Sequence, residues 1–261
     1  MELQLIKTCL LNQYMEKVTG IEEHFEALKD AEISTDDFSF YTSVSAMASS
    51  KIEGEQLEID SYIKHKMLNI DYNKDLIEKP NDLHNAYTFA QSESLNEQNL
   101  LEAHRHISKH LLQQLKQGAY RQVDMLVMEH KTLRVQYEAA TKENVPRLME
   151  SLWKEINTLL AQTLSYEEVF FFASHIHLTF VNIHPFEDGN GRAGRLLEKW
   201  FIAQHLGEKA WFLQSELNYY QSVDNYYNNL NKLGTFYDSL DYSKALPFLM
   251  MLPASLELNK E

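Results

Sequence analysis

Cysteine, proline and glycine are all scarce in this chain of 261 residues. The single cysteine, Cys9, excludes an internal disulfide and fits a reducing compartment. Eight glycines and five prolines are few for this length, which favours helices over a turn-rich sheet protein. No apolar run approaches the length of a membrane span, and residues 1–14 lack the basic-then-apolar layout of a signal peptide. We therefore expect a cytoplasmic protein.

Positive charge is also in short supply. The chain has 24 Lys and Arg against 38 Asp and Glu, so its formal net charge is −14. An acidic chain is a poor electrostatic match for nucleic acid or an anionic membrane, and we expect neither as a partner. Hydrophobic residues make up 44%, enough to bury the core of one large domain or two small ones.

The stretch 184–195, His-Pro-Phe-Glu-Asp-Gly-Asn-Gly-Arg-Ala-Gly-Arg, carries the clearest chemistry. The most hydrophobic segment of the chain, 169–183, precedes it, and an apolar helical pattern follows it. The stretch is therefore predicted to be the turn between two buried helices and to open the second. Glycine lets backbone N–H groups converge on a ligand, and a helix N-terminus adds partial positive charge. This pattern predicts an anion site.

Four side chains in the stretch extend this prediction. Arg192 and Arg195 are three residues apart and share a helix face, which suits a polyphosphate. Asp188 is a hard oxygen ligand that could hold Mg²⁺ against phosphate oxygens. His184 is the group that can accept a proton near neutral pH, and the nearby helix N-terminus favours its neutral form. The alternative, a structural turn capped by His184 with solvated arginines, explains fewer of these residues.

This stretch resembles the signature of the Fic domain, His-Pro-Phe-x-(Asp/Glu)-Gly-Asn-Gly-Arg-x-x-Arg, at every specified position. The resemblance implies an all-α Fic fold, a helical bundle with a short β-hairpin flap. It also implies an enzyme that transfers AMP from ATP to a hydroxyl side chain of a target protein, with His184 as the catalytic base and Mg²⁺ on Asp188. The implied ATP-binding residues in the stretch are Asp188, Gly189, Asn190, Gly191, Arg192, Gly194 and Arg195.

A second resemblance lies upstream, at the end of a helix expected over 39–52. Residues 49–54, Ser-Ser-Lys-Ile-Glu-Gly, are similar to the inhibitory motif of autoinhibited Fic proteins, (Ser/Thr)-x-x-x-Glu-(Gly/Asn), with Ser49 and Glu53 at the specified positions. The resemblance implies that Glu53 pairs with Arg195, which would then be unable to hold the γ-phosphate of ATP. The alternative is an ordinary helix C-terminus with an exposed glutamate.

Two short strands are expected over 123–128 and 133–137, with a turn over 129–132. By resemblance they form the Fic flap, which aligns the target over the active site through Val135, Gln136 and Tyr137. Many relatives place a Pro-Pro pair after the flap, and this chain has Ala139-Ala140.

Helical patterns fill most of the remaining chain. Helices are expected over 2–30, 79–93 with a start at Lys79-Pro80, 145–160, and 241–258, and Ser165 with Glu168 forms a capping box for a core helix. The helix expected over 95–116 holds His104, His106 and His110. His106 and His110 are four residues apart and could ligate a metal, but no cysteine or strong carboxylate partner is nearby in the sequence, so they are interpreted as structural or exposed. The resemblance places Tyr226 and Tyr227 near the adenine, although packing on the core with wet hydroxyls explains each of them equally well.

These observations give two regions, an N-terminal helical region over 1–94 with the inhibitory helix at about 39–54, and a Fic core over 95–261. The core holds the flap at about 123–138, the signature loop 184–195 and the C-terminal helices. The predicted function is an autoinhibited protein adenylyltransferase acting on a Ser, Thr or Tyr of an unidentified target. A de-AMPylase using the same site and a nucleotide-gated interaction protein are the alternatives, and self-modification and homodimerisation stay open.

Overall fold

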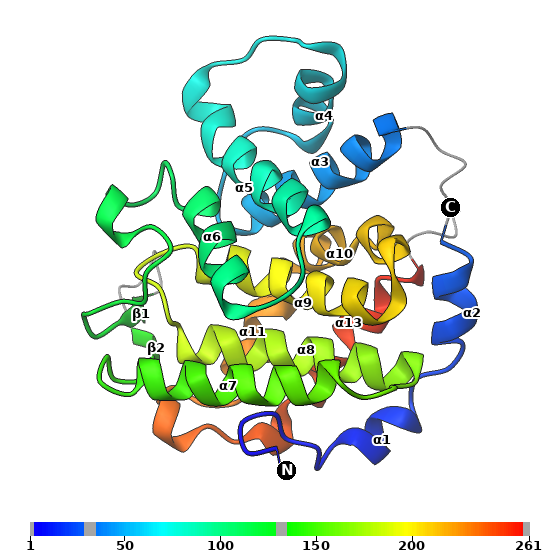
Figure 1. Cartoon of the computed structure of the whole chain (residues 1–261), viewed down its shortest axis with the longest axis vertical. Helices are drawn as coiled ribbons and strands as arrows, with labels where there is room; N and C mark the ends of the chain where they lie inside the picture. Colours follow the sequence, from blue (N-terminus) through cyan, green and yellow to red (C-terminus); the bar gives the residue numbers. More distant parts are fainter. Residues whose placement is uncertain (1–2, 29–34, 129–134, 258–261) are drawn as a thin grey trace.

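Two adjacent helices, α8 (Tyr166–Ile183) and α9 (Asn190–Leu206), run through the middle of the computed structural model (Figure 1). The structure describes residues 3–28, 35–128 and 135–257. The other α-helices are α1 (Leu11–Met15), α2 (Ile21–Glu26), α3 (Thr35–Ile52), α4 (Ile59–Leu68), α5 (Lys74–Ser92), α6 (Glu97–Ile107), α7 (Val145–Leu160), α10 (Ser215–Gln221), α11 (Val223–Asn231), α12 (Leu246–Leu249) and α13 (Met251–Ala254). Short 3₁₀ turns lie at Gln114–Lys116, Glu208–Phe212, Tyr237–Ser239 and Tyr242–Lys244. The all-α prediction is confirmed, with one small hairpin.

The amino-acid sequence explains why α8 and α9 form the core. The capping box at the start of α8 is present, with the Ser165 side chain accepting from the Glu168 N–H and the Glu168 carboxylate accepting from the Ser165 N–H. Most residues of α8 are buried, as an apolar helix without a polar face requires. Gly194 of α9 lies against α8, where a Cβ would stand 2.8 Å from Val181 Cγ1 and 2.9 Å from His177 Cδ2. Glycine at this position therefore allows the two helices to approach closely.

Replacing Gly194 by alanine is expected to destabilise the fold. The added methyl group would overlap Val181 and His177, and an overpacked core typically costs about 1–3 kcal/mol. Thermal unfolding followed by circular dichroism should show a melting temperature several degrees lower than that of the wild type. An unchanged melting temperature would show that α8 and α9 can separate without cost.

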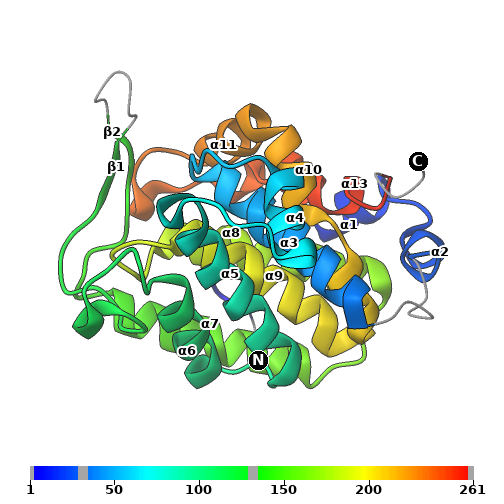
Figure 2. The same cartoon turned by 90° about the horizontal axis from the view of Figure 1, so that it is seen from above.

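The hairpin consists of β1 (Leu126–Met128) and β2 (Val135–Glu138), paired antiparallel. Figure 2 shows it standing away from the helices at one edge of the molecule. Leu126 pairs with Glu138 and Met128 with Val135, and a bulge between the second and third pairs leaves Gln136 without an opposite residue. The predicted turn 129–132 lies outside the described residues. β1 is shorter than predicted, and β2 extends one residue beyond its predicted end, to Glu138.

The N-terminal segment departs from the expected helix over 2–30. Residues 3–10 are not helical, because the buried Glu155 carboxylate of α7 accepts the backbone N–H groups of Gln4, Leu5 and Ile6. These N–H groups therefore donate to a side chain that is distant in the sequence, and not to carbonyl groups of a helix. Two short helices, α1 and α2, then pack on α8.

Two other expected helices also differ. Helix α5 starts at Lys74 and not at Lys79, because the Asn73 side chain caps it by accepting from the Asp75 N–H. Pro80 lies inside this helix. The final segment 241–258 forms a 3₁₀ turn and two short helices in place of one continuous helix.

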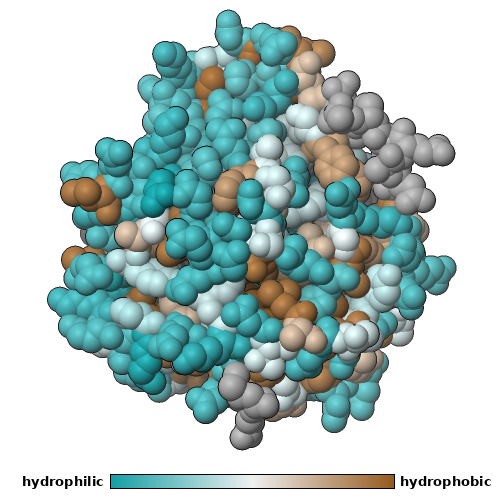
Figure 3. All heavy atoms as spheres, viewed as in Figure 1, coloured by the Kyte–Doolittle hydropathy of each residue, from teal (hydrophilic) through white to brown (hydrophobic). Residues whose placement is uncertain are grey.

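The main hydrophobic core is continuous from the N-terminal helices to the C-terminal ones, and every described α-helix except α4 contributes buried residues to it. The surface in Figure 3 is mainly hydrophilic, with small separate hydrophobic areas. Within the described part of the chain, no helix combines the length and hydrophobicity that a membrane crossing needs.

Candidate active site

His184 occupies the C-terminal end of α8 in a left-handed backbone conformation, with φ 56° and ψ 59°. This conformation is costly for a residue with a Cβ, and it turns the chain sharply towards the loop that follows. The ring Nδ1 lies 3.2 Å from the Val181 carbonyl, which can only accept, so Nδ1 carries the proton. The other nitrogen, Nε2, makes no hydrogen bond among the described residues and keeps its lone pair. Burial lowers the pKa of His184 below 6.5, and the nearby Arg121 adds to the effect.

The loop after His184 is held rigidly from within. The Asn190 side chain accepts from the Phe186 N–H at 2.9 Å and donates to the Phe186 carbonyl at 2.8 Å. Gly189 has φ 80°, a conformation that favours glycine, and precedes the first residue of α9. Because the Asn190 amide is engaged in the loop, its backbone N–H is the part of this residue that can meet a phosphate.

His104 of α6 supports the same loop from outside. Its Nδ1 accepts from the Gly118 N–H at 3.0 Å, so its Nε2 donates to the Asp188 carbonyl at 2.9 Å. The ring stacks on Phe186 with 3.5 Å between centroids. Burial lowers the pKa of His104 to about 4, which keeps the ring neutral for this arrangement. His104 therefore has a structural role in the described residues, and its contacts explain why it is buried.

Arg121 joins the loop to the hairpin. Its Nε donates to the His184 carbonyl at 2.7 Å and its Nη2 contacts the Ile183 carbonyl, while Nη1 donates to Val123 at 2.6 Å and Nη2 to Ala140. Its backbone N–H donates to the Pro185 carbonyl at 2.9 Å. One buried guanidinium thus links the C-terminal end of α8 to the two segments that flank the hairpin. Nothing in the sequence pattern singled out Arg121.

A pocket of about 340 Å³ opens between the hairpin and the loop, a volume typical of small-molecule sites. The residues that line it are Glu53, Met125, Leu126, Val127, Met128, His184, Glu187, Asp188, Gly189, Asn190 and Gly191. The predicted base, the predicted metal ligand and the loop glycines at the start of α9 therefore share one cavity.

Arg192 and Arg195, in the first turns of α9, contact carboxylates that lie just after the end of α3. Arg195 is fully buried, and its Nη2 donates to Glu53 Oε1 at 2.7 Å and to the Ser49 carbonyl at 3.1 Å, while its Nε donates to Ser49 Oγ at 2.8 Å. Arg192 Nη2 lies 3.6 Å from Glu55 Oε1. Burial alone would raise the pKa of Glu53, but Arg195 and Arg192 outweigh it and hold that pKa below its usual value.

The Glu53 carboxylate also covers the first turn of α9. A Cβ added at Gly191 would overlap Glu53 Oε1, so the acid lies directly over this glycine. Glu53 therefore takes the position at the helix N-terminus where an anionic ligand would bind.

Asp188 is exposed at the pocket and is the candidate metal ligand. Its Oδ1 accepts from the Gly189 N–H at 2.6 Å, and its Oδ2 has no partner among the described residues. No cluster of three or more His, Cys, Asp or Glu side chains suited to a metal is present in the described ranges. One free carboxylate oxygen fits Mg²⁺, which usually takes one or two carboxylates together with phosphate oxygens and water.

The two tyrosines of α11 differ from each other. Tyr226 is 1% exposed, and its hydroxyl lies 3.3 Å from Arg195 Nη1 and 3.1 Å from His177 Nε2. Tyr227 is 38% exposed, and its hydroxyl donates to the Ile52 carbonyl at 3.2 Å. The Tyr226 ring is therefore buried among core side chains, whereas Tyr227 has a surface that a base could reach. The adenine contact implied for the two tyrosines stays a prediction.

The structure also places three further residues that the resemblance implied. Gly194 packs on α8 and is not among the residues that line the pocket, so its observed contacts are packing contacts and its ATP contact stays a prediction. Tyr137 points inward and donates to the Asn182 carbonyl at 2.7 Å, which anchors β2. Val135 is exposed, and the hairpin residues that line the pocket belong to β1 and the residue before it. The target contact implied for Val135, Gln136 and Tyr137 stays a prediction.

The comparisons with known proteins agree on the Fic family as the one that this chain resembles. The model of the Fic/DOC family matches residues 94–202. A curated protein from Nematostella vectensis named "Protein adenylyltransferase Fic" is 32% identical over 117 residues, which are 43% of this chain and 24% of that protein. The chain thus spans about a quarter of the length of that relative.

Solved structures agree with this match. A Fic family protein from Desulfovibrio desulfuricans G20 superposes with a TM-score of 0.74 at 20% identity, covering 98% of this chain and 73% of the other. A Fic domain containing signaling protein from Bacteroides thetaiotaomicron gives 0.68 at 21% identity, covering 91% and 94%. At these identities the structures establish the fold, a helical bundle with a small hairpin.

Proposed function

Because the Fic/DOC family model matches residues 94–202, we propose that this chain is a protein adenylyltransferase that moves AMP from ATP to a hydroxyl group of a target protein. The observation that carries the proposal is the placement of His184. Its Nε2 lone pair is free among the described residues, its Nδ1–H is fixed on Val181, and the ring lines the same pocket as Gly189 and Gly191. A neutral base beside an anion site is the arrangement that phosphoryl-group transfer to a hydroxyl requires.

The phosphates of ATP are proposed to lie over the start of α9. The first N–H groups of that helix have no partner within the helix, and its dipole favours negative charge there. Arg192 and Arg195 add two guanidinium groups on the same side. These groups would bind the triphosphate and stabilise the charge that develops on the α-phosphate oxygens.

Asp188 would hold Mg²⁺ together with the phosphates, through the carboxylate oxygen that has no partner among the described residues. When bound, the ion would supply charge neutralisation of the phosphates. The chain itself contributes one side-chain ligand within the described ranges, so the nucleotide and water would complete the coordination.

The transfer step follows from the free nitrogen of His184. Nε2 accepts the proton of a Ser, Thr or Tyr hydroxyl as its oxygen bonds to the α-phosphorus. The bond from that phosphorus to the bridging oxygen breaks, and pyrophosphate leaves with the bonding electron pair. The products are a protein carrying AMP on oxygen, pyrophosphate and a proton on His184, which the solvent removes.

The target is proposed to bind along β1. Residues 125–128 line the pocket, whereas Glu138 at the end of β2 already donates its N–H to Thr235 at 2.7 Å. Within the described residues β1 has an unpaired outer edge, which can accept an extended segment of another chain by strand addition. This geometry would place a side chain of the added strand above His184.

Arg121→Lys is expected to lower AMP transfer on the order of 10- to 100-fold. Lysine keeps the charge, but a single ammonium group cannot bind the end of α8 and both ends of the hairpin together, and small misplacements of reacting groups are costly. Hydrogen exchange should show faster exchange in β1 and β2. Arg105→Lys, at an exposed arginine paired with Glu102, is the control that should leave both measurements unchanged. Equal transfer by the two variants would contradict the positioning role.

We further propose that the wild-type protein is autoinhibited by α3. Glu53 and Ser49 together accept three hydrogen bonds from the Arg195 guanidinium. Glu55 lies near Arg192, and Lys79 pairs with Glu55 at 2.9 Å. An arginine paired with a carboxylate cannot also bind the terminal phosphate, so ATP would bind in an unproductive position.

The test of the proposed function is mass spectrometry of the intact protein after incubation with ATP and magnesium, with and without a candidate target. An added AMP on the Glu53→Gly protein or on the target supports transfer. Binding of ATP with no added AMP under any condition would favour a nucleotide-gated interaction protein instead.

A further inference from the structure

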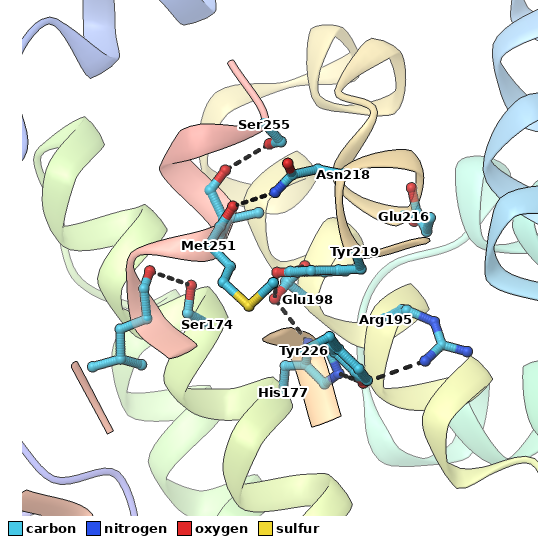
Figure 4. Close-up of polar contacts among 12 residues, drawn as sticks. Ser174, His177, Arg195, Glu198, Glu216, Asn218, Tyr219, Tyr226, Met251 and Ser255 are labelled. Carbon is cyan, nitrogen blue, oxygen red and sulfur yellow. Dashed lines mark hydrogen bonds and ion pairs between the residues drawn. The ribbon is translucent and has the colours of Figure 1, made fainter. Parts of the chain in front are cut away.

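A chain of buried polar groups lies behind Arg195, on the side away from α3. It links the Arg195 guanidinium to the Tyr226 hydroxyl, the His177 ring and the Glu198 carboxylate, which come from α9, α11, α8 and α9 (Figure 4). All four side chains are at most 1% exposed. None of the last three lines the pocket, so they touch the site only through Arg195.

The direction of each hydrogen bond follows from what the groups can donate. Arg195 can only donate, so the Tyr226 oxygen accepts from Nη1 at 3.3 Å. The Tyr226 O–H is then left for His177 Nε2 at 3.1 Å, which must carry a lone pair. The ring proton is therefore on Nδ1, where Glu198 Oε2 accepts it at 2.9 Å. The Glu198 carboxylate thus fixes the tautomer of His177, which in turn orients the Tyr226 hydroxyl.

With these hydrogen-bond directions, the Tyr226 hydroxyl and the His177 ring each donate to an acceptor in the series. Burial raises the pKa of Tyr226 to about 12, although Arg195 opposes the shift, so the hydroxyl remains a donor at neutral pH. The Arg195 guanidinium also lies over the Tyr226 ring, with 5.8 Å between Cζ and the ring centroid. Arg195 is therefore held on this side both by a hydrogen bond and by an aromatic face.

The other partners of Arg195 come from α3. If Glu53 leaves Arg195 when ATP binds, as the proposed function requires, the contacts on that side are exchanged for phosphate oxygens. The contact with Tyr226 belongs to the core and is kept in both states. We infer that Tyr226, oriented by His177 and Glu198, is a positioning residue that aims the Arg195 guanidinium at the outer phosphates of ATP, and not a residue of the adenine pocket.

The decisive comparison is between ATP and AMP, which share the base and differ in the phosphates that Arg195 would reach. The variant is Tyr226→Phe in the Glu53→Gly protein, which keeps the ring and removes only the hydroxyl. Calorimetric titration in magnesium-free buffer, where turnover is prevented, should show ATP binding weakened about tenfold, the typical effect of losing a hydrogen bond to a charged group. AMP binding should stay within about twofold. With magnesium, the KM for ATP should rise more than kcat falls.

The matched control is Tyr62→Phe in the same protein. Tyr62 is also fully buried, and its hydroxyl donates to Asn81 at 2.9 Å in a separate cluster of the α4 and α5 region. This variant loses a buried hydroxyl bond of the same kind but should bind both nucleotides as the parent does. Equal weakening of ATP and AMP by Tyr226→Phe, or no weakening of ATP, would overturn the inference.

A second measurement does not depend on nucleotide binding, so it separates this inference from the proposed function. Nitrogen-15 NMR of the His177 ring should show the neutral form protonated on Nδ1, and a crystal structure of Tyr226→Phe should show the Arg195 guanidinium displaced. If neither nucleotide binds the Glu53→Gly protein, the proposed function fails, and the positioning role is still decided by these two results. A ring protonated on Nε2, or an unmoved guanidinium, would refute it.

Discussion

The His184→Ala variant is expected to lose AMP transfer by about 10²–10⁴-fold while still binding ATP. The imidazole provides the proton acceptor through Nε2, whereas the phosphates are proposed to bind the start of α9 and its arginines. Removing the ring therefore removes the base and leaves the anion site intact. The measurement is the rate of labelling with isotopically marked ATP in the Glu53→Gly protein, beside calorimetric titration of ATP.

The control for this variant is His106→Ala, at a half-exposed histidine of α6 that does not line the pocket. It should label at the parental rate. Labelling by His184→Ala as fast as by the parent would exclude a base at this position.

The pH dependence gives an independent check on His184. Its pKa is held below 6.5 mainly by burial, and catalysis needs the neutral ring. As pH falls, the labelling rate should therefore decline with a midpoint below pH 6.5. A midpoint above 6.5 would show that another group limits the reaction.

The Glu53→Gly variant is expected to raise self-labelling or target labelling by at least about tenfold. The Glu53 carboxylate bonds Arg195 at 2.7 Å and covers Gly191, so its removal frees both the guanidinium and the helix N-terminus. Charge-assisted pairs of this kind contribute more than ordinary hydrogen bonds, and a change of 1.4 kcal/mol corresponds to about tenfold. Time courses with marked ATP and magnesium provide the measurement.

Glu58→Gly is the matched control for this variant, because Glu58 lies five residues away and pairs at the surface with Lys51. It should not change labelling. The same two proteins distinguish AMP transfer from the reverse reaction, the removal of AMP from a modified protein. Glu53 lines the pocket beside His184 and could hold the water that the reverse reaction needs. If Glu53→Gly instead loses removal of AMP from a modified protein and gains no transfer, the de-AMPylase interpretation is the better one.

The central part of the structure could be predicted from the sequence because its signals are local. The capping box of α8, the apolar run that follows and the glycine-rich turn are each contained in a short window. The hairpin was predicted from two alternating runs, although its turn lies outside the described residues. The contact between Glu53 and Arg195 came from resemblance alone and is present, while its regulatory meaning stays a prediction.

The errors share a different cause, which is that the decisive contact lies far away in the chain. The N–H groups of residues 4–6 bond Glu155, about 150 positions later, and so do not form a helix. The burial of Tyr226, whose hydroxyl contacts His177 and Arg195, likewise depends on residues distant in the sequence. A lone arginine in a turn, such as Arg121, has no periodicity, and its partners are backbone groups that the sequence does not mark.

The contacts of Arg121 have a consequence for how such a protein can change. Every hydrogen bond that its guanidinium makes in the described structure ends on a main-chain oxygen, at Val123, Ala140, Ile183 and His184. Carbonyl oxygens are the same whatever side chain they accompany. Under the proposed function, substitutions of side chains along the hairpin would therefore change which target protein binds and leave the backbone anchor beside His184 in place. The exposed positions of the hairpin are then the natural place to redesign target recognition.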